Sequence, residues 1–148
     1  MSILEIYRKA ALPGGRALIA AIFIVAGLQK ITGYAGTAGY MEAMGVPGGL
    51  LPLVILTELG GGLALLLGWQ TRWAAFLLAG FSVLSGILFH LVGYFSLEGA
   101  EAAGQLTNFL KNLAIAGGLG YVSVLGGGAV SIDALLERGR RGHRAKLA

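Results

Sequence analysis

The chain has 148 residues, of which 56% are hydrophobic and 12% are charged, and its net charge is +4. With a mean hydropathy of +0.78, it is too apolar for a soluble protein and too short for a second domain, so we predict one transmembrane domain over residues 1–148. The chain has no cysteine and only two histidines, His90 and His143, which excludes disulfides, iron–sulfur clusters, thiolate-bound zinc and a bis-histidine haem, so we expect no metal site and no cofactor of its own.

The first predicted element is a membrane-spanning helix over about residues 16–31, after a short amphiphilic leader. We expect the sequence Pro13-Gly14-Gly15 to separate the two. The apolar run is not a cleaved signal peptide, because Lys30 and further apolar spans follow it in place of a small-residue cleavage site. A helix from Ala17 rises only about 22 Å, against a hydrocarbon core about 30 Å thick. Either Lys30 lies at the membrane edge, or the helix begins before Arg16.

Three further spans are predicted, over about residues 48–68, 73–94 and 108–129. Residues 32–47 are polar, glycine-rich and aromatic, and their central part fits one or two helical turns at the membrane interface. The polar turn at residues 69–72 is short enough only for an antiparallel helix hairpin. Residues 96–107 are predicted to form a polar loop, and residues 131–148 a solvated, basic cytoplasmic tail.

The distribution of lysine and arginine predicts the orientation. The leader, the turn at residues 69–72 and the tail carry three, one and five of them, and the other side carries at most Lys30 and Lys111. By the positive-inside rule both termini are cytoplasmic. We therefore predict an all-α, membrane-spanning four-helix bundle, antiparallel and up-down, that is multi-pass in the inner (cytoplasmic) membrane. The basic tail lacks interleaved aromatic residues, so it favours membrane lipid over nucleic acid as a partner.

Glu58 is the most informative polar residue, because it lies near the middle of the second span. A charge at that depth costs at least roughly 2.5–3.5 kcal/mol, so we expect Glu58 to face the protein interior and to mark a partner or a site. Gly61 and Gly62 share its helix face, which favours close helix packing there. The sequence leaves open whether Glu58 pairs with Lys30, Lys111 or His90. Snorkelling at helix ends explains the two lysines equally well.

Several segments together resemble a known family. They are the helix end Phe23–Ile31, the loop Gly36–Pro47, the stretch Glu58–Gly62 with Gly68 and Thr71-Arg72, and the closing Ser131–Asp133. From about Arg16 to Leu136 the chain resembles the DoxX family of small bacterial and archaeal membrane proteins. The resemblance implies a four-helix membrane protein and a link to quinone, to oxidative-stress responses and to membrane oxidoreductase complexes, since the family is named from its association with a thiosulfate:quinone oxidoreductase. It also implies that the polar positions of the family's helices are matched by Lys30, Glu58, His90, Asn108, Lys111 and Asn112.

The leading functional hypothesis is a membrane subunit associated with quinone-linked redox chemistry, with a polar intramembrane site on the outer side. The candidate catalytic residues are Glu58 and His90, because a desolvated carboxylate and a histidine can both relay protons. The candidate quinone-binding residues are Lys30, Asn108, Lys111 and Asn112. Such a protein is an enzyme only with an electron source, so we expect a bound quinone and either a partner protein or a homo-oligomer.

Two other hypotheses stay open from the sequence. The first is a non-catalytic membrane scaffold or accessory subunit of a larger complex, in which the polar residues only fix helix packing. The second is a small transporter or proton path. It is the weaker of the two, because four short helices with glycine-rich seams leave little lumen unless the protein oligomerises.

Overall fold

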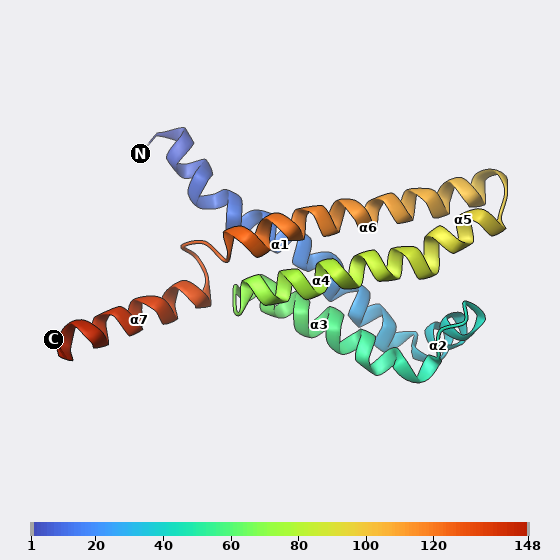
Figure 1. Ribbon diagram of the computed structural model, residues 1–148, viewed down its shortest axis with the longest axis horizontal. Coiled ribbons are helices and arrows are strands. Elements are labelled where there is room, and N and C mark those ends of the chain that lie inside the picture. The colour runs from blue at the N-terminus through green and yellow to red at the C-terminus, as the bar shows by residue number, and fades with distance from the viewer. Residues whose placement is uncertain (1, 148) are drawn as a thin grey trace.

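The computed structural model describes residues 2–147, and the side chains of all of these except residues 4, 8 and 144–147. The described residues form helices, turns and no strand (Figure 1). The helices are α1 (Ile3–Thr32), α2 (Tyr34–Ala43), the 3-10 turn η1 (Gly48–Leu50), α3 (Leu51–Leu67), α4 (Thr71–Ser85), the π-helical segment η2 (Gly86–Leu91), α5 (Val92–Ser96), α6 (Gly99–Leu125) and α7 (Ile132–Leu147). Both ends of the chain lie at one end of the molecule, and α2 lies toward the other (Figure 1).

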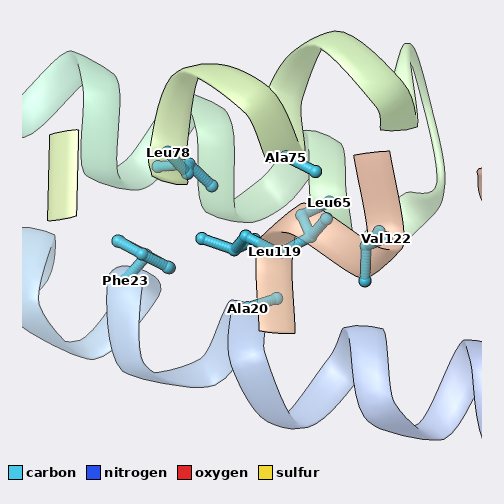
Figure 2. Packing of buried hydrophobic residues seen from close by; sticks show 7 residues of the cluster. All are labelled: Ala20, Phe23, Leu65, Ala75, Leu78, Leu119 and Val122. Carbon is cyan, nitrogen blue, oxygen red and sulfur yellow. The ribbon is translucent and has the colours of Figure 1, made fainter. Parts of the chain in front are cut away.

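The long helices pack in two main pairs, α1 with α3 and α4 with α6. Contacts of α3 with α4, and of α1 with α6, join the pairs. The buried core draws on all four of these helices (Figure 2). Its members are Ala20, Phe23, Leu65, Ala75, Leu78, Leu119 and Val122. This core is small because many large apolar side chains point outward instead, which suits a protein whose solvent is lipid.

Three helical stretches of the described chain are long and apolar enough to span a membrane: Glu5–Thr32, Gly48–Leu67 and Thr71–Ser96. Helix α6 is also long, at 27 residues, but its first half carries polar residues and it does not reach the same hydropathy. The structure therefore supports an all-helical membrane protein with three candidate spans.

Helix α1 begins well before the predicted first span and runs through Pro13 without a break. The prediction of a separate leader was therefore wrong, and the alternative that the first helix begins before Arg16 is confirmed. A proline inside a helix removes one backbone hydrogen bond, but prolines are tolerated in membrane helices because neighbouring groups satisfy the freed carbonyl. The start is fixed by Ser2, whose hydroxyl accepts a hydrogen bond from the Glu5 amide while the Glu5 carboxylate accepts one from the Ser2 amide.

Two segments predicted as irregular are helical. Most of the predicted loop at residues 96–107 belongs to α6, which begins at Gly99, because alanine and glutamate at residues 100–103 are strong helix formers. The predicted tail forms α7, whose start is capped by Ser131: its hydroxyl accepts a hydrogen bond from the Ala134 amide at 3.1 Å. Residues 138, 140 and 141 of this helix are basic and exposed, as the prediction of a solvated tail required.

Glycines allow α1 and α3 to approach closely, and one pair of substitutions tests this contact. A Cβ atom added at Gly62 would lie 3.0 Å from Ile24 Cγ1 and 3.3 Å from the Ile24 backbone nitrogen, whereas one at Gly60 would meet only Leu56 Cδ1 at 3.7 Å. We expect Gly62→Ala to lower the free energy of unfolding by about 1–3 kcal/mol. Gly60→Ala, on the same helix, should be neutral or stabilising by up to about 1 kcal/mol. Reversible unfolding in mixed detergent micelles measures both, and equal effects would contradict the contact.

Candidate functional site

Glu58 forms an ion pair with Lys30. The Lys30 Nζ lies 2.9 Å from Oε1 and 2.9 Å from Oε2 of the carboxylate. Glu58 is on α3 and only 5% exposed, and Lys30 is in the last turn of α1. The pair forms because α1 and α3 approach closely where Gly27 packs against Leu59 and Gly62 against Ile24, with no room for a Cβ atom on either glycine. Of the three pairings that the sequence left open, the structure contains the one with Lys30.

One oxygen of this carboxylate is left without a hydrogen bond. Both oxygens are at ion-pair distance from Lys30 Nζ, but only Oε1 is aligned to accept a hydrogen bond from it. The other oxygen, Oε2, is buried and has no hydrogen-bond donor among the described residues. The Lys30 ammonium at 2.9 Å still stabilises the charge on Oε2, and this oxygen keeps acceptor capacity that a donor from outside the chain can use.

The ion pair lines a cavity of about 390 Å³ at the α2 end of the molecule. Five of the six predicted site residues line this cavity, and Asn108 does not. Those five are Lys30, Glu58, His90, Lys111 and Asn112. The walls between them are largely apolar or aromatic, and include Phe81, Met41 and the stacked rings of Tyr40 and Phe89, whose centroids are 5.7 Å apart. A few polar groups in an apolar cavity of this size are typical of a small-molecule site.

His90 does not contact Glu58 directly but bonds to a residue that sequence reasoning missed. Its Nδ1 lies 2.8 Å from the side-chain oxygen of Gln105 on α6. His90 lies in the π-helical segment η2, and π-helical turns are frequent at functional sites. Gln105 went unnoticed because it lay in the predicted loop at residues 96–107, although a polar residue three positions before Asn108 on a helix shares its face.

The polar residues of α6 mostly bond to one another. Lys111 Nζ donates to Asn108 Oδ1 at 2.9 Å, and Asn112 Nδ2 donates to the Asn108 carbonyl at 3.0 Å. Lys111 is exposed, so it can turn toward the cavity that it lines. The predicted group is therefore divided into an ion pair, a histidine–glutamine pair and an α6 cluster around one cavity. Among the residues that the structure describes, no three His, Cys, Asp or Glu side chains lie close enough to hold a metal ion.

A second polar cluster, which the sequence analysis did not predict, lies at the opposite end of the molecule. Arg16 is 3% exposed and donates to the carbonyls of Gly127, Val130 (2.9 Å) and Leu66 (3.3 Å). It therefore joins α1 to the end of α3 and to the loop before α7. The sequence did contain a signal for this cluster, an arginine directly before an apolar run, but the sequence analysis used Arg16 only to mark a helix boundary.

Asp133 of α7, although far away in the sequence, caps the start of α4. Its Oδ1 accepts from the Gln70 amide at 2.8 Å, and its Oδ2 accepts from the amide and the hydroxyl of Thr71 at 2.9 and 2.7 Å. Gln70 has a left-handed backbone and makes no cap with its own side chain, so Asp133 supplies the missing cap. Burial alone would raise the pKa of the Asp133 carboxyl, but the hydrogen bonds from Thr71 and Gln70 and the charge of Arg16 together hold this pKa below its usual value.

The lowered pKa of Asp133 gives a pH-dependent stability. A carboxyl whose pKa falls on folding stabilises the fold above the unfolded pKa, about 4, and loses this contribution as pH drops through the folded pKa. We expect Asp133→Asn to cost about 1 kcal/mol at pH 7, a modest value because the carboxylate is partly exposed. The difference between variant and wild type should shrink below about pH 4. Unfolding measured from pH 7 to pH 3 checks this, and a constant difference would contradict the capping role.

A larger cavity, of about 580 Å³, lies beside this second cluster, between the start of α4, the loop after α6 and α7. Asp133 and Thr71, which line it, already bond to each other. Arg72, which also lines it, donates to the carbonyls of Ser123 and Val124 at the end of α6. These polar groups serve the fold, so the cavity at the α2 end is the better candidate site.

Comparison with known proteins identifies the family. The family described as DoxX matches residues 11–91, which is more than half of the chain. The chain belongs to the DoxX family. It is 53% identical over 123 residues to the inner membrane protein YqjF of Escherichia coli strain K12, covering 83% of this chain and 89% of that protein. It is 31% identical over 120 residues to the inner membrane protein YphA of the same organism, covering 80% and 84%. No solved structure matches the chain.

These relatives and the apolar helices make this DoxX protein a multi-pass inner membrane protein, as predicted. The DoxX match includes α1 from residue 11 onward, α3 and the segment carrying His90, and so includes Lys30 and Glu58. It ends at residue 91, before α6, which supplies Gln105 and Lys111. The matched region therefore contains the ion pair, and the other side of the cavity comes from a helix outside it.

Proposed function

We propose that this DoxX protein binds the head group of a lipid-soluble quinone in the cavity at the α2 end and exchanges protons with it, while a partner protein or small reductant supplies the electrons. The observation that carries the proposal is the buried Lys30–Glu58 ion pair, which lines an apolar cavity inside a membrane protein and has no hydrogen-bond donor aligned with Oε2. Reduction of a quinone consumes two electrons and two protons, so a binding site for it needs groups that hold protons.

The residues of the cavity fit a flat ring with two carbonyl groups. Phe81 and the stacked Tyr40 and Phe89 offer aromatic faces for the ring. Lys111 is a donor to a carbonyl oxygen, and Lys30 can share its ammonium between Glu58 and a second carbonyl. A volume of about 390 Å³ is within the range of small-molecule sites. The long apolar tail of such a ligand would remain in the lipid.

Glu58 and His90 are the proposed proton-exchanging residues. Glu58 accepts a hydrogen bond from Lys30 on Oε1, and Oε2, which is also 2.9 Å from the ammonium but has no aligned donor, is the oxygen proposed to exchange a proton with a ligand hydroxyl. His90 lines the same cavity, and an imidazole ring can both donate and accept a proton. The chain has no cysteine, so the electrons are expected to come from outside it, which makes this protein one component of a redox reaction.

We also propose four membrane spans, with α6 as the fourth and both termini cytoplasmic. The two chain ends lie at the same end of the molecule, which supports an even number of crossings (Figure 1). The basic residues in the first half of α1 and in α7 support a cytoplasmic location for both ends. Because the chain has no cysteine, single cysteines report position cleanly. An impermeant maleimide should label Gly36→Cys in intact spheroplasts but Gly139→Cys only after lysis. The reverse pattern would overturn the orientation.

The quinone proposal is tested by what the protein retains in mild detergent. We expect a quinone in the extract of purified wild-type protein. Glu58→Gln should retain it at least about tenfold less, as expected when a hydrogen bond to a charged group is lost. Thr57→Val is the matched control, because its hydroxyl bonds only to the Leu53 carbonyl of its own helix. A wild-type extract without quinone, together with full quinone reduction by Glu58→Gln, would overturn the proposal.

The same experiment distinguishes a scaffold. If Glu58→Gln and His90→Ala lower the melting temperature but leave every co-purified complex and its turnover intact, the cavity residues act only in packing. Proton flux into liposomes that depends on Glu58 would instead favour a proton path.

A further inference from the structure

The His90–Gln105 contact bears on which ring nitrogen carries the proton. The side-chain oxygen of Gln105 lies 2.8 Å from Nδ1 of His90. With the amide oxygen toward the ring, as in this structure, Nδ1 is the donor, and in a neutral ring Nε2 then carries the lone pair. An unconstrained neutral histidine favours the opposite form, with the proton on Nε2.

The charges around the cavity favour the same arrangement. The two nitrogens of an imidazole point to nearly opposite sides of the ring, and Gln105 does not line the cavity whereas His90 does. Because Nδ1 is bonded to Gln105, Nε2 is the ring nitrogen left for a ligand in the cavity. The cations that line it, Lys30 of α1 and Lys111 of α6, have only donors to offer. A lone pair on Nε2 of His90 interacts favourably with these ammonium groups, whereas an N–H on Nε2 does not. The acidic group of α3, Glu58, is already paired with Lys30.

Local packing holds Gln105 in place. A Cβ atom at Gly93 would lie 3.3 Å from Gln105 Cδ, so the glycine gives this side chain room beside the segment that carries His90. At the start of η2, Gly86 lies close enough to Asn112 that a Cβ atom there would be 3.1 Å from Asn112 Cβ. These two glycines bring the π-helical segment against α6, which places the imidazole beside the amide.

We propose that Gln105 is a positioning residue that holds His90 with its proton on Nδ1, so that Nε2 faces the cavity as a proton acceptor. The inference rests on the proposed function for its chemical meaning, because an acceptor at this point would receive a hydrogen bond from the hydroxyl of the reduced ligand, which is the product of the proposed reaction. Together with Oε2 of Glu58, it gives the cavity two acceptors, which favour a ligand in its hydroxyl-bearing form. The tautomer itself is a property of the protein without ligand.

NMR of the full-length protein with ¹⁵N-labelled histidine tests the proposal. In a His143→Gln background only His90 remains, so its two ring nitrogens can be assigned directly. We expect the neutral ring to carry its proton on Nδ1. Gln105→Leu should shift the ratio of the two forms by about tenfold toward the Nε2–H form. Gln105→Glu keeps an acceptor and should preserve the Nδ1–H form.

Thr107→Val is the matched control on the same helix, because its hydroxyl bonds to the Ala103 carbonyl and not to His90. It should leave the tautomer unchanged. A wild-type ring with its proton on Nε2 would mean that the Gln105 amide is reversed and donates to Nδ1, and this result would overturn the inference. So would a ring that stays Nδ1–H in Gln105→Leu. If the wild-type protein binds no quinone but its His90 ring carries the proton on Nδ1, the result counts against the proposed function and not against the role of Gln105.

Discussion

Replacing Lys30 with methionine is expected to lower the free energy of unfolding by about 3 kcal/mol. Removing one member of a buried ion pair costs about 3–5 kcal/mol, because the other charge is left without compensation. The lower end applies because the Lys30 side chain is still 25% exposed, while that of Glu58 is only 7% exposed. Reversible unfolding in mixed micelles at neutral pH measures the loss.

A double variant separates the ion pair from simple loss of packing. Lys30→Met with Glu58→Leu replaces both charges by apolar groups, which is often neutral or stabilising for a buried pair. We expect it to recover most of the lost stability. Lys111→Met is the control, because this lysine is exposed and bonds within its own helix, so it should cost less than about 1 kcal/mol. A double variant no more stable than Lys30→Met alone would argue against an energetic role for the pair.

Arg16→Met should be at least as damaging, with an expected loss of about 3–5 kcal/mol. Three backbone carbonyls, from the end of α3 and from the loop before α7, would lose their common donor in a buried site. Without the Arg16 guanidinium the loop at residues 126–131 should also lose its attachment to α1, so we expect faster proteolytic cleavage there. Unfolding measurements and the rate of cleavage check the two expectations separately.

Arg72→Met is the matched control for Arg16. Arg72 also donates to two backbone carbonyls at a helix end, those of Ser123 and Val124, but its side chain is exposed. Water can replace those hydrogen bonds, so we expect a loss below about 1 kcal/mol. Equal effects of the two substitutions would show that burial does not decide the importance of Arg16.

The sequence could locate Glu58 and the face it occupies, because a carboxylate in the middle of an apolar span has few acceptable positions. It could not choose between Lys30, Lys111 and His90 as the partner. Spacing along one helix defines a face of that helix, but not which neighbouring helix meets it or how far that helix is rotated. That choice depends on the packing of Gly27 of α1 against Leu59 and of Gly62 of α3 against Ile24, which only the packed structure shows.

Gln105 and Arg16 were missed for a different reason, since both lay at predicted element boundaries. The turn at Gly99 uses a left-handed backbone, and α6 begins about two and a half turns before the predicted start of the fourth span at residue 108. Pro13 was interpreted as a break, although a membrane helix can continue through it. Hydropathy defines the lipid-embedded part of a helix, whereas the polar residues that matter here lie in extensions beyond that part.

The burial of Glu58 has a consequence for how the protein is assembled in its membrane. Lys30 is near a helix end and can reach the interface by itself, but a carboxylate in the middle of α3 has no such alternative if that helix enters lipid alone. We expect α1 to remain beside the insertion machinery until α3 emerges, so that the two helices enter the bilayer together as a hairpin. For Lys30→Met the cost would then arise during biosynthesis, as chains that fail to insert and are degraded.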